Sequence, residues 1–544
     1  MQGLMQDWPL LASTILDHAN TNHGEREIVT RTIEGPIHRT SYSEVHSRAR
    51  KVAKALESRG VTLGDRIGTL AWNTHRHLEA WYGIMGLGAI YHTINPRLFP
   101  EQLVYIINHA EDRMIFVDLT FVPILEGIQD KIGCVETFVI MTDADHMPDT
   151  SLKNAVAYED LVNGVDDDFA WKIFDENTAA GLCYTSGTTG NPKGVLYSHR
   201  SNVLHGMAAS ARDAFNVGSM DSIMPVVPMF HANAWAIAFV APMTGAKIVM
   251  PGMQMDGASI HSLLEDEKVT FTAAVPTVWL MLLNHMEEGN LGLSSLKRVA
   301  IGGSACPQVM IEKFQKNYGV EVVHAWGMTE MSPMGTLGAL KAGMEDLTQD
   351  EAIKIKLKQG RAIYGVEMKI TDDDGKELPR DGEAFGHLMV RGPAIAKGYY
   401  KGDGGQILDE DGWFDTGDVS TIDPLGFMQI TDRAKDVIKS GGEWISSIDL
   451  ENVAVGHPEV AEAAVIGLPH PKWDERPLLI IVRKDGSTVT KDEILSYMDG
   501  KIAKWWMPDD VAFIDEIPHT ATGKIQKMAL REQFKNHRLP TAAE

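Results

Sequence analysis

The chain has 544 residues, 44% of them hydrophobic, which is enough for at least two folded domains with sizeable cores. Its 74 acidic and 50 basic residues give a formal net charge of −24, which argues against nucleic acid or an anionic membrane as the main partner. Three widely spaced cysteines are too few for a disulfide framework, so we expect a cytoplasmic protein. No apolar run approaches the roughly 18 residues needed to cross a bilayer, so we expect no membrane insertion.

Short apolar runs that predict strands alternate with helix-like stretches between residues 65 and 118. The runs lie at 67–72, 89–93 and 114–117, and the helix-like stretches at 78–87 and 102–109. Similar strand-like runs return at 137–141, 247–250, 270–275, 298–301 and 320–324. The fold class that this alternation predicts is α/β, with a large N-terminal domain of mixed, mainly parallel sheets and helices on their faces.

The pattern changes after about residue 365. Turn-rich polar segments and brief strands predict a small β-rich subdomain at about 365–431. A compact unit follows, with strands at 461–467 and 478–483 and a helix from Lys491 to about Lys501, which starts with Thr490 and Glu493 at capping-box spacing. We therefore predict an N-terminal domain at 1–431 and a smaller, mobile α+β C-terminal domain at 432–544.

The segment from Tyr184 to Gly194, YTSGTTGNPKG, predicts a loop that wraps a polyphosphate. It follows a predicted buried strand at 179–184; its glycines let backbone N–H groups approach phosphate oxygens, and its lysine adds a mobile positive charge. A Walker A loop would place Lys and then Ser or Thr directly after the second glycine, and that spacing is absent. A flexible linker is the alternative. The residues predicted to contact a nucleotide here are Thr185, Ser186, Gly187, Thr188, Thr189, Gly190 and Lys193.

This loop resembles the phosphate-binding signature of the adenylate-forming superfamily, which comprises acyl-CoA synthetases, luciferases and the adenylation domains of peptide synthetases. Further family-like motifs appear in the family's order along nearly the whole chain. The resemblance implies an acyl-CoA ligase that uses ATP, Mg²⁺ and CoA: a carboxylic acid becomes an acyl-AMP with release of pyrophosphate, and CoA then displaces AMP. It also implies a possible homodimer. A luciferase-like oxygenase and a catalytically inactive nucleotide-binding protein stay open as alternatives.

The run HAWGMTE, which ends at Glu330, resembles the family's aromatic-Gly-x-Thr-Glu motif. The resemblance makes Glu330 the candidate Mg²⁺ ligand, and a hard cation held by one carboxylate and phosphate oxygens is common at nucleotidyl-transfer sites. Taken alone, a Thr-Glu pair is more often a helix cap. The residues of this run that would line the nucleotide are Trp326, Gly327, Met328 and Thr329.

Two polar residues further along match the family's ribose-binding pair. Asp418 lies in DTGD and Arg433 in TDR. One carboxylate can accept hydrogen bonds from both ribose hydroxyls, and a guanidinium can hold the sugar or phosphate edge rigidly. Each residue alone would be read as a member of a surface salt bridge, but their joint spacing favours a nucleotide site.

Two segments resemble the part of the family's site that receives the acyl group. In the first, Gly302, Gly303 and Ser304 follow a strand-like run, where small residues let a flat ring lie against the backbone; an ordinary strand-to-helix turn is the alternative. The second, PMFHANAW, resembles the aromatic-His segment at the carboxylate end of the pocket, with His231 as a candidate catalytic residue. Peptide-synthetase adenylation domains typically carry Asp there, so His231 argues for an acid without an α-amino group. The predicted acyl-pocket residues are His231, Trp235, Gly302, Trp326 and Met331, and Gly303 and Ser304 would also line the nucleotide.

The bulky Trp235 and Trp326 predict a short- or medium-chain acid rather than a long fatty acid. Nearby methionines would suit a sulfur-bearing chain, because thioethers contact aromatic rings favourably, but ordinary packing explains them equally well. The sequence as a whole resembles bacterial 3-methylmercaptopropionate-CoA ligases of dimethylsulfoniopropionate breakdown. A general medium-chain fatty acid-CoA ligase is the alternative.

The segment DRAKDVIKSGGE, at 432–443, resembles the family's hinge and the loop that follows it. The resemblance makes Lys435 the hinge residue and places Gly441, Gly442 and Glu443 at the CoA tunnel. A domain linker with a glycine turn is the alternative, and the two interpretations are compatible because a hinge is a linker.

Lys524, in TATGKI, matches the family's C-terminal catalytic lysine, and Lys193 would hold the leaving pyrophosphate. A lysine exposed to water gains only about 1 kcal/mol from an anion at about 4 Å, against about 4 kcal/mol at an effective dielectric constant of about 20. Domain closure would therefore have to bring Lys524 out of water for it to stabilise the reacting carboxylate and α-phosphate.

Overall fold

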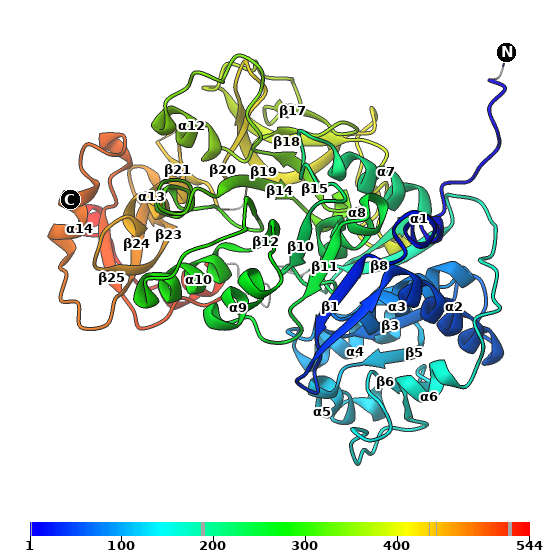
Figure 1. Cartoon of the computed structure of the whole chain (residues 1–544). Helices are drawn as coiled ribbons and strands as arrows, with labels where there is room; N and C mark the ends of the chain where they lie inside the picture. Colours follow the sequence, from blue (N-terminus) through cyan, green and yellow to red (C-terminus); the bar gives the residue numbers. More distant parts are fainter. Residues whose placement is uncertain (2, 186–190, 435, 442, 520–524, 544) are drawn as a thin grey trace.

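The computed structural model describes residues 1, 3–185, 191–434, 436–441, 443–519 and 525–543. Its strands form four sheets, two large and two small, with helices packed around them (Figure 1). The predicted α/β class, with a large N-terminal part and a smaller C-terminal part, is confirmed. Among the described residues, no helix combines the length and apolar character required to span a bilayer.

The first large sheet has seven strands in the order β7-β6-β5-β3-β4-β8-β9, and only the pair β8–β9 is antiparallel. The strands are β3 (Arg66–Leu70), β4 (Ile90–Thr93), β5 (Asp112–Val117), β6 (Thr137–Ile140), β7 (Val156–Ala157), β8 (Ala179–Tyr184) and β9 (Gly194–Ser198). The helices of this part of the chain are α2 (Tyr42–Ser58), α3 (His75–Leu87), α4 (Pro100–Ala110), α5 (Val122–Glu126) and α6 (Tyr158–Asn163).

The second large sheet has nine strands in the order β16-β15-β14-β13-β12-β10-β11-β1-β2, parallel from β1 to β14 with antiparallel strands at both edges. The strands are β1 (Glu27–Arg31), β2 (Ile37–Ser41), β10 (Ser222–Pro225), β11 (Lys247–Met250), β12 (Phe271–Ala274), β13 (Arg298–Ile301), β14 (Glu321–Gly327), β15 (Met334–Leu337) and β16 (Arg361–Ala362). The associated helices are α1 (Ser13–His23), α7 (His199–Ser210), α8 (Ile237–Thr244), α9 (Gly257–Asp266), α10 (Pro276–Gly289), α11 (Gln308–Glu312) and α12 (Gln349–Lys356).

The two small sheets lie in the last third of the chain. The first is antiparallel and consists of β17 (Glu367–Thr371), β18 (Phe385–Arg391), β19 (Phe414–Ile422) and β20 (Met428–Arg433). The second has the order β22-β21-β24-β23, with β25 parallel beside β24, and its strands are β21 (Ile438–Ser440), β22 (Glu443–Ile445), β23 (Val460–His470), β24 (Asp474–Arg483) and β25 (Asp510–Phe513). Its helices are α13 (Ser447–Val455), α14 (Lys491–Met498) and α15 (Lys527–Gln533).

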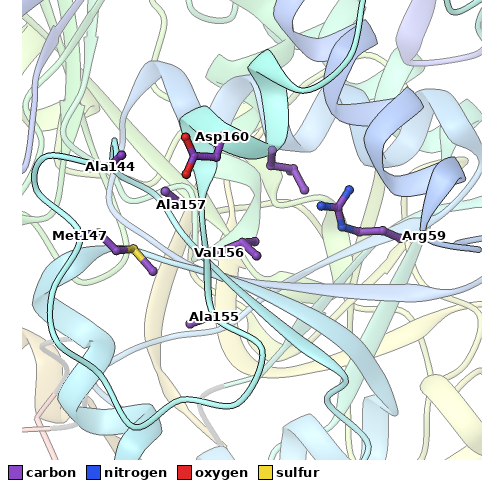
Figure 2. Close-up of a pocket in the computed structure, with 8 residues that line it drawn as sticks. Arg59, Ala144, Met147, Ala155, Val156, Ala157 and Asp160 are labelled. Atoms are coloured by element: carbon purple, nitrogen blue, oxygen red, sulfur yellow. The ribbon is translucent and has the colours of Figure 1, made fainter.

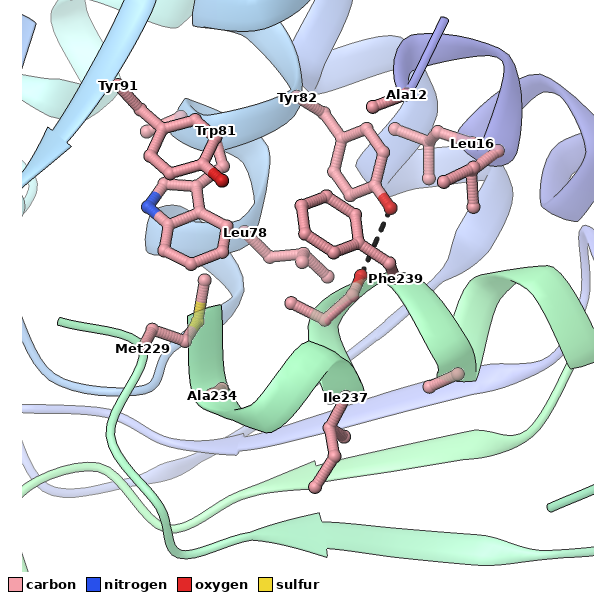
Figure 3. Close-up of a cluster of buried hydrophobic side chains, with 14 of the residues drawn as sticks. Ala12, Leu16, Leu78, Trp81, Tyr82, Tyr91, Met229, Ala234, Ile237 and Phe239 are labelled. Carbon is pink, nitrogen blue, oxygen red and sulfur yellow. Dashed lines mark hydrogen bonds between the residues drawn. The ribbon is translucent and has the colours of Figure 1, made fainter. Parts of the chain in front are cut away.

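The largest core lies where α3 meets α1 and α8 (Figure 3). Trp81 of α3 stacks on Tyr91 of β4 with ring centroids 4.3 Å apart, and the Tyr82 hydroxyl donates a hydrogen bond of 3.0 Å to the carbonyl of Ala238. Each of these aromatic rings is fully buried, and burial of one such side chain contributes about 1.5–3 kcal/mol. This core fixes the start of α8, and with it the preceding segment 232–236, against the first sheet.

Helix caps explain where predicted and observed bounds differ. The α3 helix begins at His75, three residues before the predicted start, because the Thr74 hydroxyl accepts a hydrogen bond from the His77 N–H and caps the helix. The capping box predicted at Thr490 and Glu493 is confirmed, with both reciprocal hydrogen bonds present. That helix ends at Met498 rather than near residue 501, because Asp499 is extended and Gly500 has a φ of +76°.

Candidate active site

The predicted phosphate loop connects the antiparallel strands β8 and β9, in which Tyr184 pairs with Gly194. At the base of the loop, the Thr185 N–H donates to the Lys193 carbonyl at 2.9 Å, and the Lys193 N–H donates to Thr185 Oγ1 at 3.1 Å. Because β8 also pairs in parallel with β4, the loop lies at the carboxyl edge of the first sheet, where α/β proteins commonly bind ligands. The remaining loop residues of the prediction, Ser186, Gly187, Thr188, Thr189 and Gly190, lie outside the described residues.

Lys193 is the cation of this loop. Its ammonium nitrogen lies 4.9 Å from the centroid of the Tyr399 ring, within the range of a cation–π contact. Within the part of the chain that the structure describes, Lys193 forms no ion pair with a carboxylate. Its positive charge is therefore available to an anionic ligand.

Glu330 is a buried carboxylate on the short 3₁₀ helix Thr329–Met331, just after β14. Its Oε1 accepts a hydrogen bond of 2.6 Å from the Tyr399 hydroxyl, and its backbone carbonyl accepts one of 2.8 Å from the Ala396 N–H. The neighbouring Thr329 carbonyl accepts a hydrogen bond of 2.7 Å from the Tyr197 hydroxyl. Among the described residues, Oε2 of Glu330 has no hydrogen-bond partner and the carboxylate has no ion pair.

This environment fits a divalent cation. A buried carboxylate without a basic partner leaves a local negative charge that a hard cation would neutralise. The described residues contain no group of three or more acidic, His or Cys side chains placed to hold a metal. Oxygen atoms of phosphate and water would therefore have to complete the coordination, as is usual for Mg²⁺ bound with a nucleotide.

The predicted ribose pair is brought together by the pairing of β19 with β20, in which Asp418 lies opposite Arg433. Arg433 Nε lies 2.8 Å from Asp418 Oδ1, and the Trp326 indole N–H donates to Asp418 Oδ2 at 2.9 Å. Asp418 is buried, whereas about two fifths of the Arg433 side chain is exposed. Oδ1 is engaged by the Arg433 ion pair and Oδ2 accepts the Trp326 hydrogen bond, so ribose hydroxyls would use the remaining lone pairs of the carboxylate.

The segment after His231 adopts an unexpected left-handed turn, with φ between +44° and +66° from Ala232 to Ala236. Such values are uncommon for residues other than glycine and cost energy. A buried hydrogen-bond network holds the turn: the Tyr91 hydroxyl donates to Asn233 Oδ1 at 2.9 Å, and the Asn233 amide donates to Asn202 Oδ1 at 3.3 Å. Sequence reasoning missed these three residues, because they come from separate segments with no shared motif.

The turn places Trp235 against the end of β13. A Cβ atom at Gly302 would lie 3.1 Å from the Trp235 ring and 2.8 Å from the Ala325 carbonyl, so only glycine fits there. Met331 is buried beside Trp326: a Cβ atom at Gly335 would lie 2.5 Å from the Trp326 ring and 2.8 Å from Met331 Cε. The predicted acyl-pocket residues Trp235 and Gly302 are thus neighbours, as are Trp326 and Met331.

The remaining predicted residues of this region lie at the carboxyl edge of the second sheet. Gly303 and Ser304 are exposed directly after β13, beside the parallel strand β14 that leads to Thr329 and Glu330. Gly303 has a φ of +84°, which favours glycine. Gly327 and Met328 belong to the same edge, where the Met328 N–H donates to the Pro333 carbonyl at 2.9 Å.

The C-terminal predictions are described only in part. Lys435, Gly442 and Lys524 lie outside the described residues. Gly441 has a φ of +62°, and a Cβ atom there would lie 2.8 Å from the Trp473 ring, so the position requires glycine. Glu443 begins β22, where its backbone pairs with Ser440.

A hollow also lies away from this site. It has a volume of about 370 Å³ and lies between Arg59, Met147 and Asp160 at the β7 edge of the first sheet (Figure 2). The phosphate-loop hairpin β8–β9 forms the opposite edge of that sheet. No charged cluster or predicted site residue lines the hollow, so we assign no function to it.

Comparison with known proteins identifies the class. A family model described as "AMP-binding enzyme" matches residues 16–400, and one described as "AMP-binding enzyme C-terminal domain" matches residues 449–524. The chain therefore belongs to the AMP-binding enzyme family, and the predicted resemblance to adenylate-forming enzymes is confirmed.

Similar proteins narrow the class further. The chain is 51% identical over 536 residues to a 3-methylmercaptopropionyl-CoA ligase of Ruegeria lacuscaerulensis, covering 98% of this chain and 99% of that protein. It is 49% identical over 534 residues to a medium-chain-fatty-acid-CoA ligase of Ectopseudomonas oleovorans, covering 98% of each. The crystal structure of the anthranilate CoA ligase AuaEII with anthranoyl-AMP matches with a TM-score of 0.85 at 25% identity, over 98% of this chain and 99% of that chain. The predicted enzyme class, an AMP-forming acyl-CoA ligase that uses ATP and CoA, is confirmed.

Proposed function

We propose that this enzyme activates a short- or medium-chain carboxylic acid, with 3-methylmercaptopropionate as a candidate substrate. The observation that carries the proposal is near full-length identity of 51% to a 3-methylmercaptopropionyl-CoA ligase and 49% to a medium-chain-fatty-acid-CoA ligase. Trp235, Trp326 and Met331 are bulky and buried. If they line the acyl pocket as proposed, they would leave less room for a long chain, which supports a limited chain length.

In the first half-reaction, the acid's carboxylate attacks the α-phosphate of ATP and pyrophosphate leaves. Asp418 and Arg433 would hold the ribose, while the phosphate loop and Lys193 would hold the departing phosphates. Glu330 would hold Mg²⁺, which when bound neutralises phosphate charge. Lys524 would stabilise negative charge that develops between the carboxylate and the α-phosphate, and His231 would lie at the carboxylate end of the acyl pocket.

In the second half-reaction, the CoA thiol displaces AMP from the acyl-adenylate. We place the boundary between the moving parts at 431–432 and the hinge at Lys435, so that rotation withdraws Lys524 and brings segment 441–443 to the site. Gly441, whose conformation already requires glycine, would let the pantetheine arm pass close to the backbone. The enzyme would act in the cytoplasm, and a homodimer is the oligomer that we expect.

A panel of acids tests the substrate class. Pyrophosphate release should be measured for 3-methylmercaptopropionate, butyrate, octanoate and palmitate, each with and without CoA. We expect the highest kcat/KM for the short- and medium-chain acids and CoA-dependent turnover. A preference for palmitate would contradict the chain-length proposal. Oxygen consumption in place of thioester formation would instead favour the luciferase-like alternative.

A further inference from the structure

A segment that sequence reasoning did not assign connects the two charged groups of the phosphate site. Residues 396–404, which we call the strap, run from the small antiparallel sheet to the β8–β9 hairpin. The Ala396 N–H donates to the Glu330 carbonyl at 2.8 Å. Further along, Lys401 forms an ion pair of 2.7 Å with Glu111. The strap is therefore attached at both ends, and Tyr399 lies between these attachments.

Tyr399 contacts both charged groups at once. Its hydroxyl donates a hydrogen bond of 2.6 Å to Glu330 Oε1, and its ring lies 4.9 Å from the Lys193 ammonium nitrogen. Glu330 and Lys193 carry opposite charges, yet they are not within ion-pair distance, since the described residues give neither of them a salt bridge. The side chain that touches both is the neutral tyrosine.

The chemistry of a tyrosine suits this position. In the contact with Glu330, the Tyr399 hydroxyl is the hydrogen-bond donor and the carboxylate oxygen is the acceptor. A neutral donor fixes one carboxylate oxygen without cancelling the negative charge, which leaves Oε2 for a cation. The ring face holds the ammonium by a contact that leaves its N–H groups able to donate to phosphate.

We propose that Tyr399 is a positioning residue that keeps Glu330 and Lys193 apart and correctly oriented, so that the carboxylate receives the metal ion and the ammonium receives the departing phosphates. This inference rests on the proposed roles of Glu330 and Lys193. Without Tyr399, the flexible lysine would be free to pair with the carboxylate, and each charge would then be less available to its ligand.

Two substitutions separate the two contacts. Tyr399→Phe keeps the ring and removes the hydroxyl, whereas Tyr399→Leu removes both. Tyr400→Phe is a matched control, because the neighbouring tyrosine also lies on the strap and its hydroxyl has no hydrogen-bond partner in the described part of the chain. Binding of Mn²⁺, used as the probe for the divalent site, should be followed by electron paramagnetic resonance in the presence of the non-reactive analogue α,β-methylene-ATP.

We expect Tyr399→Phe to weaken Mn²⁺ binding about tenfold, because one hydrogen bond to a charged group is lost. The affinity for the ATP analogue at saturating metal should change by less than about twofold. Tyr399→Leu should weaken both. Tyr400→Phe should leave both unchanged. In turnover, Tyr399→Phe should raise the Mg²⁺ concentration at half-maximal rate about tenfold while kcat at saturating Mg²⁺ stays within about twofold.

A double-mutant cycle with Glu330→Gln completes the test. If the hydroxyl acts through the carboxylate, Tyr399→Phe will cause no further loss of Mn²⁺ binding in the Glu330→Gln background. Equal losses in both backgrounds, or an equal effect of Tyr400→Phe, would overturn the proposal and show that the strap only supports the fold. The metal titration does not require turnover, so it gives an answer even if no acid in the panel is activated.

Discussion

Trp326 connects a residue of the proposed acyl pocket to the proposed ribose carboxylate. Its ring packs over the position where Gly335 has no Cβ, and its indole N–H holds the buried Asp418 carboxylate at 2.9 Å. A substitution that moves this ring should therefore also disturb Asp418 and weaken binding at the proposed ribose site.

Gly335→Ala tests this link. The new Cβ would lie 2.5 Å from the Trp326 ring, closer than packed atoms can approach, so the indole must shift and its hydrogen bond to Asp418 weakens. We expect the KM for ATP to rise about tenfold, the scale of one hydrogen bond to a charged group. Steady-state kinetics with ATP varied measures this effect. Gly133→Ala is the control, because nothing lies within 4 Å of a Cβ at that position.

Asp118 gives a second prediction at this scale. The carboxylate is buried, accepts a hydrogen bond of 2.6 Å from the Trp72 N–H, and has its pKa raised from 3.8 to about 7 by burial. In the folded protein it holds its proton up to about pH 7, whereas the unfolded chain loses it near pH 4. Its contribution to stability is therefore fully present below the unfolded pKa and is lost as the pH rises towards the folded pKa.

Asp118→Asn removes this titration and keeps an acceptor for the Trp72 N–H. We expect the variant to be more stable than the wild type at pH 8, by up to about 4 kcal/mol, and the difference to shrink by more than half at pH 5. Urea unfolding at the two pH values measures the difference. A gap of the same size at pH 5 and pH 8 would show that Asp118 does not titrate in this range.

At the scale of elements, hydrophobic patterning predicted the sheets well, because buried parallel strands read as short apolar runs between turns. The bounds of β8, β11 and β13 coincide with the predicted runs. The left-handed turn at 232–236 could not be predicted, because four of its five residues are Ala or Trp, which have no preference for positive φ, and because the turn is held by the distant Tyr91 and Asn202. The order of the motifs predicted that Glu330 and Lys193 belong to one site. The contacts of Tyr399 with both residues could not be predicted, because no sequence spacing indicates them.

The start of α13 gives a prediction at this scale. The Ser446 hydroxyl caps the helix by accepting from the Asp449 N–H at 3.1 Å and also donates to the Thr431 carbonyl, on the other side of the predicted hinge. The Ser447 N–H donates to Asp432 at 2.8 Å. These contacts hold the start of α13 to the end of β20, so weakening them should loosen the proposed hinge.

Ser446→Ala removes the cap and the contact to Thr431, at a cost of about 1 kcal/mol for the cap. We expect limited proteolysis within 434–441 to become about five times faster, since the opening equilibrium changes by that factor for such an energy. Thr490→Ala is the matched control, because it removes an equivalent cap from α14 without touching the hinge. Equal acceleration in both variants would indicate general destabilisation instead.

In the molecule as a whole, the order of motifs along the chain predicted the class of enzyme. The fold explains this success, because it brings the segments that carry the motifs together. Segments near residues 185, 330, 418 and 433 come from three different sheets, and their packing brings the base of the 184–194 loop, Glu330 and the Asp418–Arg433 pair to one region. Acyl chain length was not predictable to the same degree, because the room in the proposed pocket would depend on how Trp235, Trp326 and Met331 pack rather than on which residues they are.

The proposed rotation of the C-terminal part between the two half-reactions leads to a prediction about Lys524. If this lysine stabilises charge only while the acyl-adenylate forms, Lys524→Ala should slow that half-reaction by about 10² to 10³, the scale for losing one charge-stabilising donor. Thioester formation from supplied acyl-AMP and CoA should keep nearly its full rate, because the proposed rotation would withdraw Lys524 at that step.

Single-turnover measurements of each half-reaction separate the two effects. Lys484→Ala is the control, since Lys484 is an exposed lysine of the same C-terminal part that forms no ion pair in the described residues. If Lys524→Ala slows both half-reactions equally, the lysine supports binding or folding in general. The proposal that one site carries out the two half-reactions in turn, with Lys524 present only for the first, would then be wrong.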